Sequence, residues 1–181
     1  MKNPACGVFL RLLFMMEEKQ GGPMSWDVVV CRFSRTYTRM NQIDEDGSLL
    51  PMGSRAHIHA AISALFPDTD WSEPGWGKHQ GPFGSVVFSV SDEEPVDSVM
   101  PHVRAGEGIV APIVELCLKH GWQAMDTTAG TFLEQKPVPE QGVTQWMAYR
   151  NQVLGQRQDP SAALPGALRR KRWTARWRRL P

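Results

Sequence analysis

Cysteine is scarce in this chain, with only Cys6, Cys31 and Cys117 among 181 residues. The three are odd in number and far apart, and they show neither a CxxC pair nor cysteine–histidine spacing suited to a metal. This pattern excludes a disulfide-rich secreted scaffold and a zinc module, and it favours a reducing cytoplasm. Cys31 lies in a β-branched run and Cys117 on an apolar helical stripe, so both are predicted to be small core residues.

Long apolar runs are absent as well. The longest N-terminal run, Val8 to Met16, is interrupted by Arg11, is too short to span a bilayer and precedes no small-residue cleavage site. A membrane span and a secretory signal are therefore not expected. Gly21-Gly22-Pro23 precedes Met24, and codons for Gly-Gly can spell a ribosome-binding sequence. We interpret residues 1–23 as a leader outside the native protein and Met24 as the natural start.

Catalytic and metal-binding motifs are missing. The chain contains no GxSxG sequence, and no Ser or Cys stands near a His and a carboxylate at the spacing of a known family. His57 and His59 are two residues apart on a predicted helix, which is not the i, i+4 spacing that grips zinc. Asp68, Asp70 and Glu73 lack the calcium-loop pattern. We expect no cofactor and no metal, and a binding protein rather than an enzyme.

Charge is distributed unevenly although the chain carries only +1 in total. Residues 1–23 carry +1, residues 24–155 carry −7 and residues 156–181 carry +7. We therefore divide the chain into a leader (1–23), an acidic α+β domain (24–155) and a basic flexible tail (156–181).

Hydrophobic patterning within the domain predicts alternating strands and helices. The predicted order is a strand at 25–33, a helix from Ser54 to Leu65, strands at 84–91 and 96–104, a helix from about Gly108 to Gly121 and a strand at 122–133. Pro101 favours an edge position for the strand that contains it. This order predicts a ferredoxin-like βαββαβ sandwich, with a four-stranded antiparallel sheet and two helices on one face. A third helix at 141–154 is expected to dock on it.

The stretch from Phe66 to Gly77, FPDTDWSEPGWG, is predicted to be a rigid aromatic and acidic loop between a helix and a strand. Such a segment either closes a core or presents a surface, and the sequence leaves both roles open for Trp71 and Trp76. Further acidic turns are predicted at Asp44–Asp46 and at Asp92–Asp97.

An alternative site is an anion pocket at the start of the second helix. The turn Arg104-Ala105-Gly106-Glu107-Gly108 leads into a helix N-terminus, whose free N–H groups favour an anion, but it lacks the full GxGxxG spacing. The candidate residues for a small anion binder or enzyme are Lys78, His79, His102, Arg104, Gly106 and Gly108.

A further alternative concerns the tail, where Trp173 and Trp177 lie among arginines. This composition suits contact with nucleic acid or with an anionic membrane, although the acidic domain would repel nucleic acid.

The region from Trp26 to Glu134, about three-fifths of the chain, resembles a set of small bacterial proteins. The resemblance rests on seven short matches, namely Trp26-Asp27, Phe66-Pro67, Thr69-Asp70-Trp71, Trp76-Gly77, His102-Val103-Arg104, Gly121-Trp122 and Phe132. It implies no specific activity. In size and style the chain is also loosely similar to immunity proteins that neutralise bacterial toxins.

The leading hypothesis from the sequence is a cytoplasmic protein-binding module, of the immunity-type antitoxin class, that binds a basic protein partner. Many toxins that attack nucleic acids are basic, which suits a domain charge of −7. The predicted partner-binding residues are Asp68, Asp70, Trp71, Glu73, Trp76, Asp92, Glu93 and Glu94.

Overall fold

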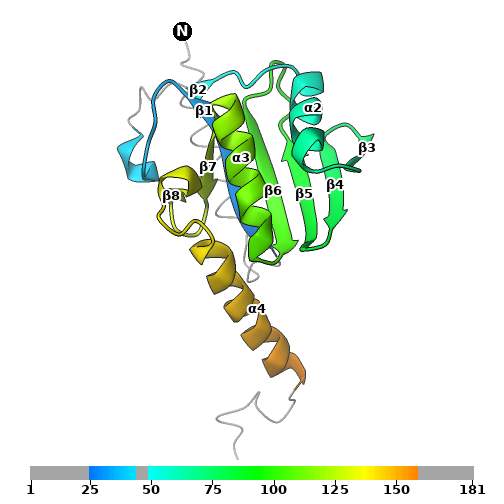
Figure 1. Ribbon diagram of the computed structural model, residues 1–181, viewed down its shortest axis with the longest axis vertical. Coiled ribbons are helices and arrows are strands. Elements are labelled where there is room, and N and C mark those ends of the chain that lie inside the picture. Colours follow the sequence, from blue (N-terminus) through cyan, green and yellow to red (C-terminus); the bar gives the residue numbers. More distant parts are fainter. Residues whose placement is uncertain (1–24, 44–48, 159–181) are drawn as a thin grey trace, which may run out of the picture.

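The computed structural model describes residues 25–43 and 49–158 and shows an α+β protein built on one antiparallel sheet (Figure 1). The strands are β1 (Trp26–Phe33), β2 (Leu49–Leu50), β3 (Asp70–Glu73), β4 (Trp76–Gly81), β5 (Gly84–Val90), β6 (Ser98–Ala105), β7 (Gln123–Asp126) and β8 (Thr131–Phe132). The α-helices are α2 (Arg55–Leu65), α3 (Val110–His120) and α4 (Gln141–Gln158). Short 3-10 turns occur at Met40–Gln42, Glu107–Ile109 and Leu133–Gln135.

The α+β class is confirmed, but the prediction of a four-stranded ferredoxin-like sheet is wrong. The described part of the sheet has eight strands in the order β3-β4-β5-β6-β1-β7-β8, with β2 paired to β1. The four predicted strands are present and adjacent, as β5-β6-β1-β7. Two hairpins account for most of the difference: the predicted aromatic loop forms β3 and the start of β4, and the predicted last strand divides into β7 and β8 around a turn that ends at Gly130 (φ 61°).

Pro101 does not mark an edge strand. Strand β6 lies between β5 and β1, and its pairing with β5 is continuous through Phe88 and Pro101. On the other side, the pairing between β1 and β6 skips Val28 and Val29, which stand opposite Pro101 and Met100. Proline has no N–H to donate, and the sheet accommodates this by a local interruption of the pairing between β6 and β1.

The predicted helix signals are confirmed. The Ser54 hydroxyl accepts a hydrogen bond from the His57 N–H at the start of α2. Helix α3 ends at Gly121, whose left-handed backbone (φ 67°) suits glycine. Both helices lie over the same face of the sheet (Figure 1), and their apolar stripes close the main core around Ile58, Ile62 and Ile113.

A second, smaller core lies on the opposite face of the sheet, which we call the back face. There the segment after β1 folds over β1, β7 and β8, and Tyr37 exchanges two hydrogen bonds with the Gln123 side chain. Its apolar contacts include Val29, Cys31 and Phe132. The core placement predicted for Cys31 and Cys117 is confirmed, and burial raises the pKa of the Cys31 thiol to about 12.

Helix α4 docks on the sheet only through its first turns. Val143 and Trp146 are buried, whereas Tyr149 and Leu154 are exposed, and the helix projects away from the domain (Figure 1). The third helix predicted at 141–154 is thus present and continues to Gln158, but its distal half does not dock. Cys6, the predicted leader, the turn at 44–46 and the tail beyond Gln158 lie outside the described residues.

Candidate functional site

Trp71 fixes the β3–β4 hairpin to helix α2. Its indole N–H donates a hydrogen bond to the Ser63 hydroxyl at 3.0 Å, and its ring stacks on His59 with 3.8 Å between centroids. The same His59 ring bonds the Pro74 carbonyl oxygen at 2.9 Å, so one histidine holds both the strand and the turn. The indole lies over Gly77, where a Cβ atom would come within 2.4 Å of it. Trp71 is therefore a structural residue of a rigid hairpin.

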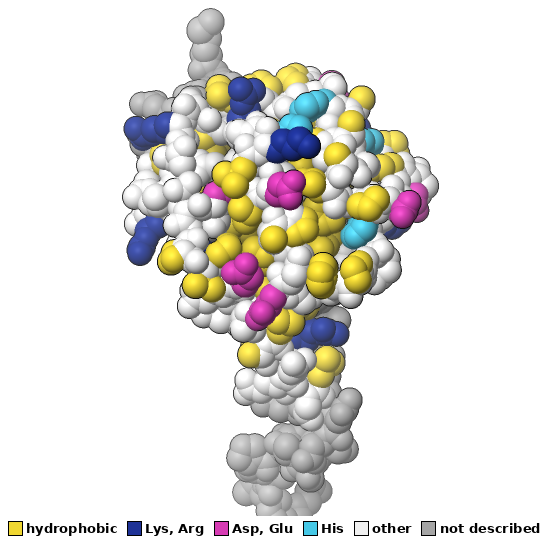
Figure 2. All heavy atoms as spheres, viewed as in Figure 1, with side chains coloured by type: hydrophobic (Ala, Val, Ile, Leu, Met, Phe, Trp, Pro, Cys, Tyr) yellow, Lys and Arg dark blue, Asp and Glu magenta, His cyan; other side chains and the backbone are white. Residues whose placement is uncertain are grey.

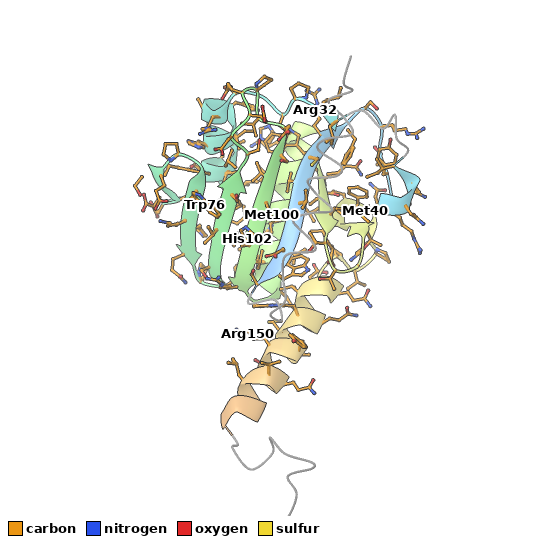
Figure 3. All side chains as sticks on the ribbon, turned by 180° about the vertical axis from the view of Figure 1, so that it is seen from behind. Arg32, Met40, Trp76, Met100, His102 and Arg150 are labelled. Carbon is orange, nitrogen blue, oxygen red and sulfur yellow. The ribbon has the colours of Figure 1, made fainter. Side chains whose placement is uncertain are left out.

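Trp76 has the opposite role, because strand alternation places it on the back face while Gly77 faces the helices. It is 44% exposed and pairs directly with Glu73 across the hairpin. Its ring stacks loosely on His102 of β6, with centroids 6.3 Å apart and planes 20° from parallel. Figure 3 shows Trp76, Met100 and His102 together on this face. Trp76 is thus a large, positioned and accessible aromatic side chain.

Carboxylates line the outer strand of the same hairpin. Glu73 forms an ion pair with Lys78 at 2.6 Å. The backbone N–H and the hydroxyl of Ser72 both bond Asp70, and these bonds lower the pKa of the Asp70 carboxyl. Asp68 sits in the preceding turn with a left-handed backbone (φ 62°). The outer edge of the sheet is therefore acidic, with one lysine neutralising one glutamate.

The β5–β6 loop brings a second acidic group to the same end of the sheet as Glu73. The Val90 N–H donates to the Gly75 carbonyl oxygen at 2.9 Å, which joins this loop to the β3–β4 turn. Arg55 anchors the loop from α2, through its guanidinium to Asp92 at 3.9 Å and through its backbone N–H to Glu94 at 3.2 Å. We call this end of the sheet the acidic corner; Glu73 and Trp76 contribute to it from the back face, and Asp92, Glu93 and Glu94 contribute to it from the loop.

The acidic corner unites five of the eight predicted partner-binding residues. The other three lie elsewhere: Trp71 is packed under α2, and Asp68 and Asp70 belong to the opposite end of β3. The two roles left open by the sequence are therefore divided between the two tryptophans, with Trp71 closing the core and Trp76 presented at the surface.

The candidate anion-binding residues are split by the sheet. Lys78, His102 and Arg104 lie on the back face, where the register sets Lys78 and His102 on either side of Val87. His79 points to the helix-covered face and contacts the buried Phe66.

The helix N-terminus of the anion hypothesis is covered by an aromatic ring. The Gly106 N–H donates to the Phe83 carbonyl oxygen at 2.7 Å, and the Phe83 ring lies so close to Gly108 that a Cβ atom there would be 2.5 Å from it. The two glycines thus serve close packing of the turn against Phe83.

Asp27 is a site residue that the sequence reasoning missed. This buried carboxylate accepts a hydrogen bond from the Ser25 hydroxyl at 2.7 Å. The same carboxylate contacts the His102 Nδ1 at 2.9 Å, and this contact orients the imidazole ring. The pairing depends on the register of β1 against β6, which local pattern does not specify. The available signal was that Asp27 is an acidic residue within the otherwise apolar first half of β1.

Within residues 25–43 and 49–158, no three His, Cys, Asp or Glu side chains converge in a way that would hold a metal ion. In the same ranges, no helix is both long and apolar enough to cross a membrane.

Comparison with protein-family models, with curated proteins and with solved structures finds no match to this chain.

Proposed function

We propose that this protein is a protein-binding module whose acidic corner recognises a basic protein partner. The observation that carries the proposal is Trp76: a 44% exposed tryptophan, stacked on His102 and paired with Glu73, at the end of the sheet that also carries the acidic Asp92–Glu94 loop. Tryptophan is the residue type most enriched among interface residues that dominate binding energy, and such residues are typically surrounded by polar groups that exclude water.

The rigidity of the hairpin supports this function. Trp71, His59 and Ser63 hold the hairpin against α2, so the position of Trp76 is fixed before any partner arrives. Preorganisation of this kind reduces the conformational entropy that binding costs. A tryptophan on a flexible loop would contribute less to affinity, because binding would also have to fix the conformation of the loop.

The charges define the class of partner. The corner carries four carboxylates, of which Asp92 pairs with Arg55 and Glu73 with Lys78, so acidic side chains outnumber basic ones among the described residues there. Rim charges of one sign accelerate encounter with a partner of the opposite sign and disfavour partners of the same sign. A basic protein is the partner that this charge favours. The net charge of −7 on residues 24–155 extends the negative electrostatic potential over the whole domain. The immunity-type antitoxin hypothesis, acting in the cytoplasm on a basic toxin, is the specific form of this proposal.

The anion-binding alternative has weaker support, because its residues do not converge. His79 lies on the other side of the sheet, Gly108 is packed against Phe83, and Lys78 is paired with Glu73.

The test is affinity capture from cells that naturally make the protein, with the full chain as bait. We expect one basic protein in stoichiometric amount. Trp76→Ala should weaken its binding about tenfold or more, as loss of an aromatic anchor does. The double variant Asp92→Asn/Glu93→Gln should weaken binding at low salt and flatten its salt dependence, because two rim charges are lost without a change in shape.

The matched control is Thr128→Lys/Ala129→Lys. These two residues are exposed in the β7–β8 turn at the other edge of the sheet, and the double variant changes the net charge by the same +2. Binding should be kept in this control. Equal losses in both double variants would show that only overall charge matters and would contradict the acidic corner, as would full binding by Trp76→Ala.

A further inference from the structure

The outer surface of α3 carries a shallow apolar groove of about 650 Å³ that the fold leaves open. Val114, Leu118 and Pro139 form its apolar part, and Leu118 is 67% exposed. Glu115, Glu140 and Lys119 border it. Figure 2 shows hydrophobic side chains gathered over α3 with acidic side chains beside them. Exposed leucine on a helix that already buries its other face marks a candidate contact surface.

The distal two-thirds of α4, which we call the arm (residues 147–158), has an apolar stripe that the other described residues leave largely exposed. Trp146, Tyr149, Arg150, Val153 and Leu154 follow the spacing i, i+3, i+4, i+7 and i+8, so they share one face of the helix. At its start this stripe buries Trp146 against the domain, but Tyr149 and Leu154 remain 44% and 40% exposed. Beyond Trp146 the helix leaves the domain (Figure 1).

The arm and the groove are complementary in charge as well as in apolar character. Helix α4 contains no Asp or Glu, and Arg150 stands in the middle of its stripe, with the guanidinium 5.6 Å above the Trp146 ring. The groove presents two carboxylates and one lysine at its border. An arginine flanked by aromatic and aliphatic side chains therefore matches an apolar groove bordered by glutamates.

We propose that the groove is occupied by the arm of a second copy of this chain, so that two copies form a reciprocal dimer. A single copy cannot make the contact with itself, because its arm points away from the α3 surface. From Val143 to Leu154 the helix advances about 16 Å, enough to reach a neighbouring domain. A two-fold axis would use each arm and each groove once, which gives a closed dimer rather than a chain of copies.

The proposal is tested by sedimentation velocity on the full chain over a wide range of concentration. The wild-type chain should dimerise, and Leu118→Glu in the groove and Leu154→Glu in the arm should each weaken dimerisation about tenfold or more. The control is Gln152→Glu, which adds the same charge to the opposite face of the arm and should leave the dimer intact. Because all three side chains are exposed, circular dichroism should show unchanged folding.

Mixing the two disrupted variants distinguishes this contact from others. Leu118→Glu retains a good arm and Leu154→Glu a good groove, so their mixture should form a heterodimer at concentrations where neither variant dimerises alone. A monomeric wild-type chain would overturn the proposal. A mixture that stays monomeric would overturn the docking of arm into groove and would point to pairing of arm with arm. A dimer that survives Leu118→Glu would remove the groove from the interface.

Discussion

Gly142 is the residue at which α4 meets the sheet. A Cβ atom at this position would lie 2.2 Å from the Asp126 Oδ2 and 2.9 Å from the indole nitrogen of Trp26, both in buried side chains. Asp126 cannot move aside easily, because the Thr128 and Ala129 N–H groups donate to its other oxygen. The absence of a side chain at Gly142 therefore sets the distance at which α4 docks.

We predict that Gly142→Ala lowers the free energy of unfolding by about 1 to 3 kcal/mol, the usual cost of overpacking, although alanine is the better helix former. Gly155→Ala is the matched control in the same helix, since a Cβ there meets nothing within 4 Å. The control should be neutral or stabilise by up to about 1 kcal/mol. Urea unfolding measures both, and a neutral Gly142→Ala would contradict the close docking described here.

Glu134 is a partly buried carboxylate with a definite hydrogen-bonding role. It accepts the Ala124 N–H at 2.8 Å, and burial raises the pKa of its carboxyl. The Ala124 bond joins the 3-10 turn after β8 to β7, and the buried Cys117 thiol lies beside the same carboxyl.

At the scale of elements, the two histidines of α2 contact different parts of the fold, and only His59 contacts the β3–β4 hairpin. His59 stacks on Trp71 and bonds Pro74, whereas His57 contacts His120 and Trp122 at the end of α3. Helix α2 thus uses one histidine to hold the edge hairpin and the other to contact α3.

We predict that His59→Ala raises amide hydrogen exchange in residues 70–81 about tenfold while leaving β1 and β6 protected, because an aromatic stack and a hydrogen bond to the hairpin are lost together. His57→Ala removes an equally large ring from the same helix and should not change exchange in the hairpin. Equal exchange in the two variants would show that His59 does not anchor it.

The elements that the sequence predicts well are those whose signals are local. Ser54 and Gly121 mark helix ends through caps, and the apolar stripes of α2 and α3 repeat within each helix. The β3–β4 hairpin was missed because its strands are short, polar and at an edge, so alternation is weak, and Pro74 and Gly75 suggested a loop. The edge position predicted from Pro101 was wrong because whether a central strand tolerates proline depends on its pairing with the neighbouring strands, here β5 and β1.

The candidate site could be predicted only as a set of residue types. The sequence indicated that Glu73, Trp76 and Asp92 belong to acidic loops, but their meeting at one corner results from the Val90–Gly75 hydrogen bond between two hairpins. It did not separate Trp71 from Trp76, since the face that each occupies depends on the hairpin register. The contact between Asp27 and His102 could not be predicted for the same reason, since the two residues are 75 positions apart.

For the whole molecule, the two proposed surfaces lie apart. The acidic corner is at the end of the sheet near the start of α2, and the groove and arm lie around α3 and α4. A dimer formed through the arms would therefore leave both acidic corners available to partners, and loss of dimerisation alone should not abolish binding at a single corner.

Binding of a basic protein at the acidic corner is tested most directly by photo-cross-linking in cells that naturally make the protein. We would place p-benzoylphenylalanine at Trp76 or, as the control, at Phe83. Both aromatic residues are exposed, 44% and 53% respectively, but only Trp76 belongs to the acidic corner. We expect an adduct with one basic protein from position 76 and none with that protein from position 83. No adduct at position 76, or the same adducts at both positions, would contradict it.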